Sequence, residues 1–260
     1  MAFLSTFLVA FLTVAVFFNL LFLLALKLRD NSIVDIGWGI GFILVTLVTL
    51  AYSGSLEQRQ LLIAVLVLVW GLRLAIRIYL RNRGKGEDFR YKKWRDDWGE
   101  HWRRHAYLIV FVGQGVMMLI ITIPIMLANT YPGPTLGWLD LAGVVIWCVG
   151  FYFEAEGDRQ LDVFLRNPAN RGKIMDRGLW RYTRHPNYFG EVTQWWGVFL
   201  IVLSVQWGWL GIVGPITITT LIVAYSGIPM LEKTMKENPA FVEYAKRTSV
   251  FFPLPPRKAS

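Results

Sequence analysis

Long apolar runs alternate with short polar stretches along the whole chain. Seven runs approach the roughly 20 apolar residues that a bilayer-spanning helix needs. They cover about residues 3–26, 33–53, 61–80, 106–129, 136–155, 188–207 and 209–230. The first run is too long for the apolar part of a signal peptide and lacks a small-residue cleavage site, so we expect it to be retained. The pattern predicts an all-α integral membrane protein, a bundle of seven transmembrane helices whose cytoplasmic loops form a pocket.

Composition agrees with this class, because 55% of the 260 residues are hydrophobic. The net charge of +9 is not spread evenly. Lys and Arg concentrate at residues 27–29, 81–104, 159–184 and 233–258, and they are scarce at 54–60, 130–135 and 208. With seven spans, the two sets fall on opposite sides of the membrane. The positive-inside rule then predicts an outside N-terminus and a cytoplasmic C-terminus, and it argues against nucleic acid as the partner.

Two sequence features bear on metal and disulfide chemistry. The single cysteine, Cys148, excludes a disulfide framework and a cysteine-based metal site. His101 and His105 lie four residues apart, as metal ligands can, but no nearby motif completes a site. We therefore expect no metal.

The stretch from Gly178 to Gly197 combines turn residues, cations and one carboxylate at the edge of an apolar run. Pro186 suits the first turn of a helix, so a helix should begin near it and place Glu191 about one turn inside. The positive end of that helix, with Arg181 and Arg184 just before it, suits an anion. A buried acid beside an anion-binding turn is typical of an active site.

Polar residues inside other spans are further candidates. At the start of the second run, Ser32 could cap a helix, with Asp35 near its positive end and Trp38 as an aromatic anchor. Alternatively, Asp35 and Trp38 face a polar cavity. Arg73 and Arg77 are four residues apart and share a helix face, so they either line the bundle interior or extend to the cytoplasmic surface. Gly37 and Gly41 should permit close helix packing.

Each of three charged segments has two possible roles. Residues 81–105 suit a lid over a phosphate-rich ligand or a helix on anionic lipid. Helical periodicity continues from the fifth run through Leu165, so Glu154 and Asp158 could bind a ribose or adenine, or pair with Arg159. The amphipathic tail, residues 232–253, is an interfacial helix or folds Tyr244, Lys246 and Arg247 back over the pocket.

The string Gly-Leu-Trp-x-Tyr-x-Arg-His-Pro-Asn-Tyr-Phe-Gly-Glu at 178–191 resembles the steroid 5-alpha-reductase superfamily, and a bacterial branch of it most closely. The likeness extends to Asp35…Trp38, Glu87-Asp88-x-Arg90-Tyr91, Asp158-x-Gln160 and the Arg-Thr-Ser-x-Phe-Phe-Pro tail, and thus covers nearly the whole chain. The short core Arg-His-Pro-x-Tyr also occurs in sterol reductases and in S-adenosylmethionine-dependent membrane methyltransferases. The longer string with Asn187 and Glu191 favours the reductases.

The resemblance implies one membrane domain over residues 1–260, with N-terminal helices and a basic loop at 1–105 and a reductase-like half at 106–260. It implies NADPH entering from the cytoplasm, and a glutamate, Glu191, that hydrogen-bonds the carbonyl of an α,β-unsaturated ketone together with a tyrosine. An apolar span should favour the protonated carboxyl, which is a donor. The candidate cofactor-binding residues are Asn187, Arg184, His185, Tyr182, Arg181, Asp158, Arg166, Arg73, Tyr244, Arg247, Asp35 and Trp38.

Two departures from the superfamily pattern matter. The steroid enzymes carry a Gln-Glu pair near the start of the bundle, but here Glu57-Gln58 has the reverse order and falls in an outer loop. The tyrosine is also open: Tyr91 is the candidate, with Tyr188 and Trp70 as competitors. A steroid substrate is therefore not implied.

Three hypotheses follow from the residues and the resemblance. The first is an NADPH-dependent reductase of a lipophilic enone in a bacterial cytoplasmic membrane. The second is an isoprenylcysteine- or phospholipid-type methyltransferase, in which Glu191 grips the amino group of S-adenosylmethionine. The third is a lipid-binding or structural membrane protein.

Overall fold

The computed structural model describes residues 1–257; Lys258, the last cation of the basic tail, lies outside them. Over this range the chain is helical and forms no strand, apart from an isolated bridge between Thr183 and Ser249. The chain divides into two compact units. Unit 1 contains Met1–Gly137 and Val202–Gly214, and unit 2 contains Trp138–Ile201 and the chain from Pro215 onward.

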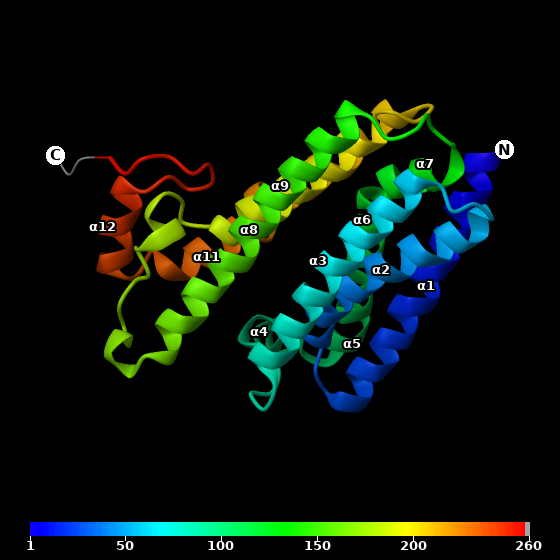
Figure 1. The fold of residues 1–260 in the computed structure, drawn as a ribbon. Helices are drawn as coiled ribbons and strands as arrows, with labels where there is room; N and C mark the ends of the chain where they lie inside the picture. The colour runs from blue at the N-terminus through cyan, green and yellow to red at the C-terminus, as the bar shows by residue number, and fades with distance from the viewer. Residues whose placement is uncertain (258–260) are drawn as a thin grey trace. The chain divides into compact units, whose positions relative to one another are not determined.

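Unit 1 is built on three long helices that lie side by side (Figure 1). They are α1 (Ala2–Leu28), α2 (Ile33–Ser53) and α3 (Gln58–Asn82). The short polar helix α4 (Phe89–Trp98) follows, and α5 (Trp102–His105) leads through a π-helical segment, Ala106–Val112, into α6 (Gly113–Ile121). The helix is interrupted at Thr122, just before Pro124, and α7 (Ile123–Thr130) continues. Since proline lacks an N–H group, the interruption just before Pro124 has a local cause.

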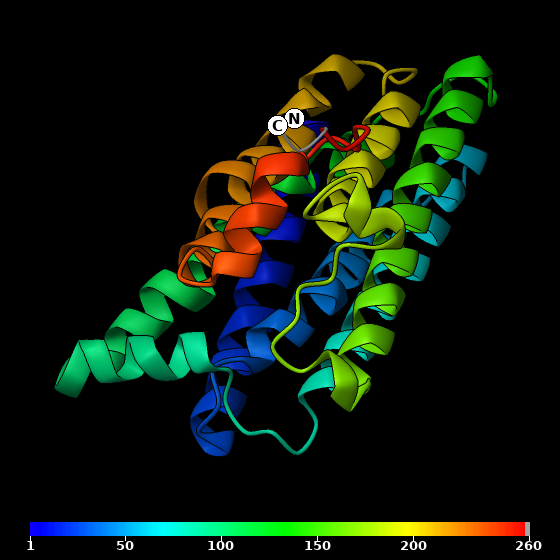
Figure 2. The ribbon, with the colours of Figure 1, turned by 90° about the vertical axis from the view of Figure 1, so that its left-hand side faces the viewer.

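Unit 2 is built on α8 (Trp138–Arg166) and α9 (Pro186–Val202), which lie side by side (Figures 1 and 2). A loop with two short 3₁₀ turns, Pro168–Asn170 and Gly178–Arg181, connects them. The rest of the unit is α10 (Val213–Thr220), a π-helical segment Leu221–Tyr225, α11 (Ile228–Met235) and α12 (Pro239–Arg247). The predicted continuation of α8 beyond its apolar part is confirmed, because the helix ends only at Arg166.

Six helices of the described chain are long and apolar enough to cross a membrane: Ala2–Leu28, Ile33–Ser53, Gln58–Asn82, Phe89–Ile121, Trp138–Arg166 and Gly208–Met235. The sequence predicts a seventh, at 188–207. That run does form α9, but the helix ends at Val202 and its 17 residues are fewer than the roughly 20 that a bilayer needs. The all-helical, multi-span class is therefore confirmed, and the seventh crossing stays a prediction.

Glycines set the closest helix contacts within each unit. In unit 2, a Cβ added at Gly143 would lie 2.6 Å from the Gly197 carbonyl oxygen, and one at Gly150 would lie 2.6 Å from that of Gly190. In unit 1, a Cβ at Gly71 of α3 would lie 2.7 Å from the Gly39 carbonyl oxygen of α2. Only hydrogen fits at such positions, so the backbones approach closely.

The two glycines expected to allow close packing on α2 meet side chains of other helices. A Cβ at Gly37 would clash with Leu21 of α1, and one at Gly41 would lie 2.7 Å from the Met118 sulfur of α6. The contact with α3 is made by a third glycine, Gly39, which faces Gly71. The expectation of close packing at Gly37 and Gly41 is confirmed.

Replacing Gly150 by alanine should separate α8 from α9. The new methyl group would meet backbone atoms, including the Gln194 nitrogen at 2.7 Å, and backbone cannot yield as a flexible side chain can. We expect a loss of about 1–3 kcal/mol in the free energy of unfolding, seen as a lower thermal midpoint in detergent. Gly113→Ala is the matched control, because its nearest atom would be 3.7 Å away. Equal midpoints for the two variants would contradict close packing at Gly150.

Candidate functional site

The start of α9 is the centre of the predicted site. The helix begins at Pro186, as the sequence predicts. The residues before it are fixed by the tail: the Arg184 N–H donates to the Ser249 carbonyl at 2.8 Å, and the Thr183 hydroxyl donates to the Phe251 carbonyl at 2.8 Å. The turn that precedes α9 is thus held by a segment about 65 residues later in the chain.

Arg184 and His185 share one carboxylate, Glu232 of α11. Arg184 donates through Nε and Nη2 to the two Glu232 oxygens, at 2.7 and 3.1 Å, and through Nη1 to the Ala245 and Thr248 carbonyls, at 3.0 and 2.9 Å. His185 Nε2 lies 3.0 Å from Glu232 Oε1. The side chains of Arg184 and Glu232 are only 12% and 10% exposed. This Arg184–His185–Glu232 clamp joins α9 to α11 and the tail.

The C-terminal helix α12 closes over the same turn. The buried Tyr244 hydroxyl donates to the Trp180 carbonyl, and Trp180 Nε1 donates to the Gly157 carbonyl of α8 at 2.9 Å. Burial raises the pKa of Tyr244, so its hydroxyl stays protonated as a donor. Arg247 pairs with Asp176 at 2.5 Å at an exposed position. The tail thus packs on the turn before α9 through Tyr244 and Arg247, while Lys246 pairs with Glu243 inside α12, and the role of the tail over a pocket stays a prediction.

Asn187 and Glu191 are half-buried on the first two turns of α9, four residues apart and therefore on one side of the helix. The Asn187 Oδ1 atom is buried, and no group of residues 1–257 donates a hydrogen bond to it. A buried amide oxygen without a donor is costly, so a ligand that brings an N–H group would satisfy it. This position suits a carboxamide.

Two turns after Asn187, on the same side of α9, lies one member of a buried polar pair. Gln194 Nε2 donates to Glu154 Oε2 of α8 at 2.5 Å and to the Gly190 carbonyl at 3.3 Å. Both side chains belong to residues that are 2% exposed. Because the glycine contacts press α8 against α9, the pair fixes the rotation of α9 and hence the direction of Asn187 and Glu191.

The other candidates of unit 2 occupy two kinds of environment. Asp158 is buried on α8, one turn after Glu154. Arg159 bonds Glu156 at 2.6 and 2.7 Å, so the alternative in which it pairs with the Glu154–Asp158 face is not the arrangement observed. The exposed candidates are Arg166, Arg181 and Tyr182. Tyr188 stacks on His185, with ring centroids 5.6 Å apart.

Unit 1 brings together Asp35, Arg90 and Tyr91. The Tyr91 hydroxyl donates to Asp35 Oδ1 at 2.6 Å, and Arg90 Nη2 donates to Asp35 Oδ2 at 2.8 Å. Asp88 caps α4 by accepting from the Arg90 N–H at 3.0 Å. Burial opposes its ionisation, but hydrogen bonds and the charge of Arg90 outweigh this and lower the pKa of Asp88. Because the Tyr91 hydroxyl is bonded to Asp35, Asp35 orients this tyrosine. Ser32 occupies the cap position of α2, but its hydroxyl bonds Asp30 and not the backbone of the helix.

Trp38, Phe42 and Trp70 form an aromatic row from α2 to α3. Successive ring centroids are 5.1 and 5.4 Å apart, with edge-to-face geometry. Arg73 and Arg77 are half-buried further along α3. At the end of α4, Trp98 stacks on His105, whose Nδ1 lies 3.0 Å from the His101 carbonyl.

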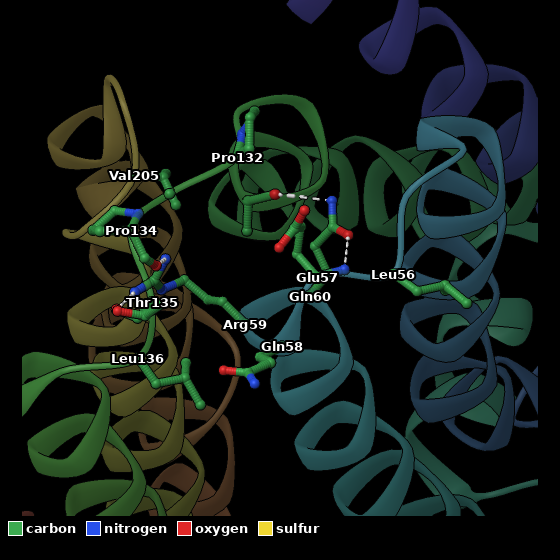
Figure 3. A pocket seen from close by; sticks show the side chains of 12 residues that line it. Leu56, Glu57, Gln58, Arg59, Gln60, Pro132, Pro134, Thr135, Leu136 and Val205 are labelled. Carbon is green, nitrogen blue, oxygen red and sulfur yellow. Dashed lines mark hydrogen bonds between the residues drawn. The ribbon is translucent and has the colours of Figure 1, made fainter.

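A cavity of about 270 Å³ lies at the start of α3 in unit 1 (Figure 3). It is lined by Glu57 to Gln60 and by the loop after α7. Arg59 Nη1 donates to the Pro134 carbonyl at 2.9 Å, and the Gln60 amide reaches the Ala128 carbonyl at 3.4 Å. These bonds fix the loop to the start of α3, and the other end of that helix lies about 35 Å away. The cavity is thus remote from Asp35 and Tyr91 within unit 1.

Sequence reasoning missed two features. Glu232 was taken only as the start of the tail, and nothing local signals that it would meet Arg184, 48 residues earlier. The glycine contact of α8 and α9 did leave a signal. Gly143, Gly150 and Gly157 recur every seven residues, as do Gly190 and Gly197, which places each set on one helix side.

Together these observations define a multi-span helical membrane protein with a polar turn at the start of α9. The chain belongs to the family described as "Protein of unknown function (DUF1295)", whose model matches residues 21–248, and to the steroid 5-alpha-reductase superfamily. The predicted superfamily is confirmed.

Similar curated proteins are named as steroid reductases. Steroid 5-alpha-reductase DET2 of Gossypium hirsutum is 36% identical over 75 residues, which are 28% of this chain and 27% of that protein. 3-oxo-5-alpha-steroid 4-dehydrogenase 1 of Bos taurus is 32% identical over 121 residues, 45% of this chain and 44% of that protein. The match therefore spans less than half the length of either relative. No solved structure matches the chain significantly.

Removing the carboxylate of the clamp should release the tail. In Glu232→Ala, Arg184 and His185 lose their shared acceptor in a largely buried place, and we expect a loss of about 3 kcal/mol or more in the free energy of unfolding. Trypsin should then cut at Lys246 and Arg247 faster than in the wild type. The control is Glu243→Ala, whose pair with Lys246 is exposed and should contribute less than about 1 kcal/mol. A Glu232→Ala protein as stable and as protease-resistant as the control would show that the clamp does not hold the tail.

Proposed function

We propose that this protein is a membrane reductase that uses NADPH to reduce the carbon–carbon double bond of a lipophilic α,β-unsaturated ketone. One observation carries the proposal. The buried Asn187 Oδ1 lacks a hydrogen-bond donor among the described residues, one helical turn before Glu191. Family membership supports the same reaction, since the curated relatives are named as steroid reductases or dehydrogenases.

The residues of unit 2 fit NADPH in three respects. The carboxamide N–H of a nicotinamide would satisfy the Asn187 oxygen. The positive end of α9 favours a pyrophosphate, and the exposed Arg181 and Arg166 are available to phosphate oxygens. The sequence predicts that Arg184 binds the cofactor, but this proposal gives it another role. Its donors are engaged by Glu232 and backbone carbonyls, so Arg184 and His185 position the turn rather than grip the cofactor.

NADPH, when bound, supplies the hydride that adds at the β-carbon. As that bond forms, the electrons of the double bond move toward the ketone oxygen. Glu191, as a protonated carboxyl, donates a hydrogen bond to this oxygen and stabilises the growing negative charge. A proton from water would then add at the α-carbon and complete the saturated ketone. Gln194 and Glu154 hold the helix that carries Glu191.

Tyr91, in unit 1, stays the sequence-based candidate for the tyrosine of the reaction. Its hydroxyl is buried and bonded to Asp35, which keeps it in one orientation. In this proposal Asp35 positions Tyr91 and does not bind the cofactor. Tyr188 is less suited to the role, because it stacks on the clamp histidine.

The membrane arrangement is also part of the proposal. We take residues 1–260 as one membrane domain with α9 as the seventh crossing, an outside N-terminus and a cytoplasmic C-terminus, in a bacterial cytoplasmic membrane. Residues 203–227, which follow α9, contain no Lys or Arg, as expected of an outside loop and the apolar helix after it. The substrate then reaches the protein from the bilayer.

Binding to detergent-purified protein tests the cofactor. NADPH should bind, and Asn187→Ala should raise its dissociation constant about tenfold, the effect of one lost hydrogen bond in a buried site. Asn187→Asp, which keeps an acceptor oxygen, should bind more tightly than the alanine variant. Thr193→Val is the control, because Thr193 bonds only the Phe189 carbonyl of its own helix. Binding of S-adenosylmethionine in place of NADPH would refute the reductase and support a methyltransferase.

Turnover tests the role of Glu191. With NADPH and a lipophilic enone, Glu191→Leu should lower kcat about 100-fold or more, since a donor to the developing oxyanion is lost. The NADPH dissociation constant should stay near the wild-type value. Glu156→Gln is the control, because Glu156 bonds Arg159 and Gln160 at the surface of α8. A Glu191→Leu protein with normal kcat would remove Glu191 from the reaction.

A further inference from the structure

One end of unit 1 carries exposed cations that the proposed reaction does not use. Arg81 lies in the last turn of α3 and Arg83 and Lys85 in the loop after it, and all three are exposed. Lys27 and Arg29, also exposed, lie where α1 ends. Figures 1 and 2 both show the ends of α1 and α3 at the same end of the unit. We call these five residues the basic end of unit 1.

Nearby acids balance only part of the charge of this basic end, because their hydrogen bonds go to other residues. Glu87 pairs with Arg95 at 2.7 Å and accepts from the Asn31 N–H at 2.8 Å. Asp88 pairs with Arg90 at 3.0 Å. Arg81 interacts electrostatically with Asp35 and Asp88, whereas Arg83 and Lys85 make no ion pair within residues 1–257 and remain exposed.

Toward this end of α3, the exposed side chains are first aliphatic, then include a tyrosine, and are finally cationic. Leu72 and Ile76 come first, 45% and 55% exposed, then Tyr79 and Leu80, 50% and 62% exposed, and then the cations. α1 repeats the order, since exposed Leu20, Leu23 and Leu24 precede its two cations. A phospholipid presents the matching sequence of acyl chain, polar interface and phosphate.

The order of side chains also separates the possible ligands. A soluble nucleotide or free phosphate would use the cations but would leave the apolar side chains one and two turns earlier without a partner. A neutral lipid would use the apolar side chains but would leave Arg83 and Lys85 without a counter-charge. Only an anionic lipid uses both sets.

We propose that the basic end of unit 1 binds anionic phospholipid, with the headgroup phosphate on Arg81, Arg83 and Lys85 and the acyl chains along the exposed faces of α1 and α3. Of the two interpretations of residues 81–105, this proposal adopts the one with anionic lipid. It is independent of the proposed reductase activity.

Native mass spectrometry of the full-length, delipidated protein tests the proposal with phosphatidylglycerol and phosphatidylcholine as probes. Phosphatidylglycerol should bind more tightly to the wild type, and the triple variant Arg81→Gln, Arg83→Gln, Lys85→Gln should weaken it at least about tenfold. Binding of phosphatidylcholine should not change. The control is Arg171→Gln, Lys173→Gln, Arg177→Gln, which removes three exposed cations from a loop of unit 2.

Three results would overturn the proposal. One is equal loss of phosphatidylglycerol in the test and control variants, which would mean that only total charge matters. Another is equal affinity of the wild type for the two lipids. The third is displacement of phosphatidylglycerol by NADPH or inorganic pyrophosphate, which would assign the loop to a soluble phosphate ligand. An unchanged thermal midpoint of the triple variant shows that it is folded.

Discussion

The close approach of α8 and α9 is the constraint on which the candidate site depends. At Gly143–Gly197 and Gly150–Gly190 the two backbones meet with no room for a methyl group. This contact fixes the distance between the helices, and the buried Gln194–Glu154 hydrogen bond fixes their rotation. The side of α9 that carries Asn187 and Glu191 therefore has a defined direction before any ligand arrives, which is the preorganisation that catalysis requires.

The clamp at the start of α9 changes the interpretation of the Arg-His-Pro motif. Arginine and histidine before a helix suggest a ligand, yet here both side chains bond Glu232 and Arg184 also bonds the tail. Both side chains are engaged in joining three separated segments, so under the proposed function the ligand contacts fall to the residues around them. A motif shared by reductases and methyltransferases can thus be a scaffold for different cofactors.

Local patterns predicted what depends on local chemistry. The helix begins at Pro186 because proline favours a first turn, and the apolar runs became helices. The pairings of Arg184 with Glu232 and of Tyr91 with Asp35 join residues 48 and 56 positions apart, and one sequence holds no signal for such pairs. The apolar pattern also did not predict the length of α9. Its apolar run continues to residue 207, but the helix ends at Val202 and a turn follows.

Transfer of deuterium tests the central claim most directly. Membranes containing the protein would be given NADPH deuterated at the nicotinamide C4 position, once on each face, with a 3-oxo-Δ4 steroid and other lipophilic enones. The account predicts one deuterium at the β-carbon of a saturated product, from one face only, and none with Glu191→Leu. Failure of every enone to acquire deuterium, with a methyl group transferred from S-adenosylmethionine to a lipid acceptor instead, would contradict it.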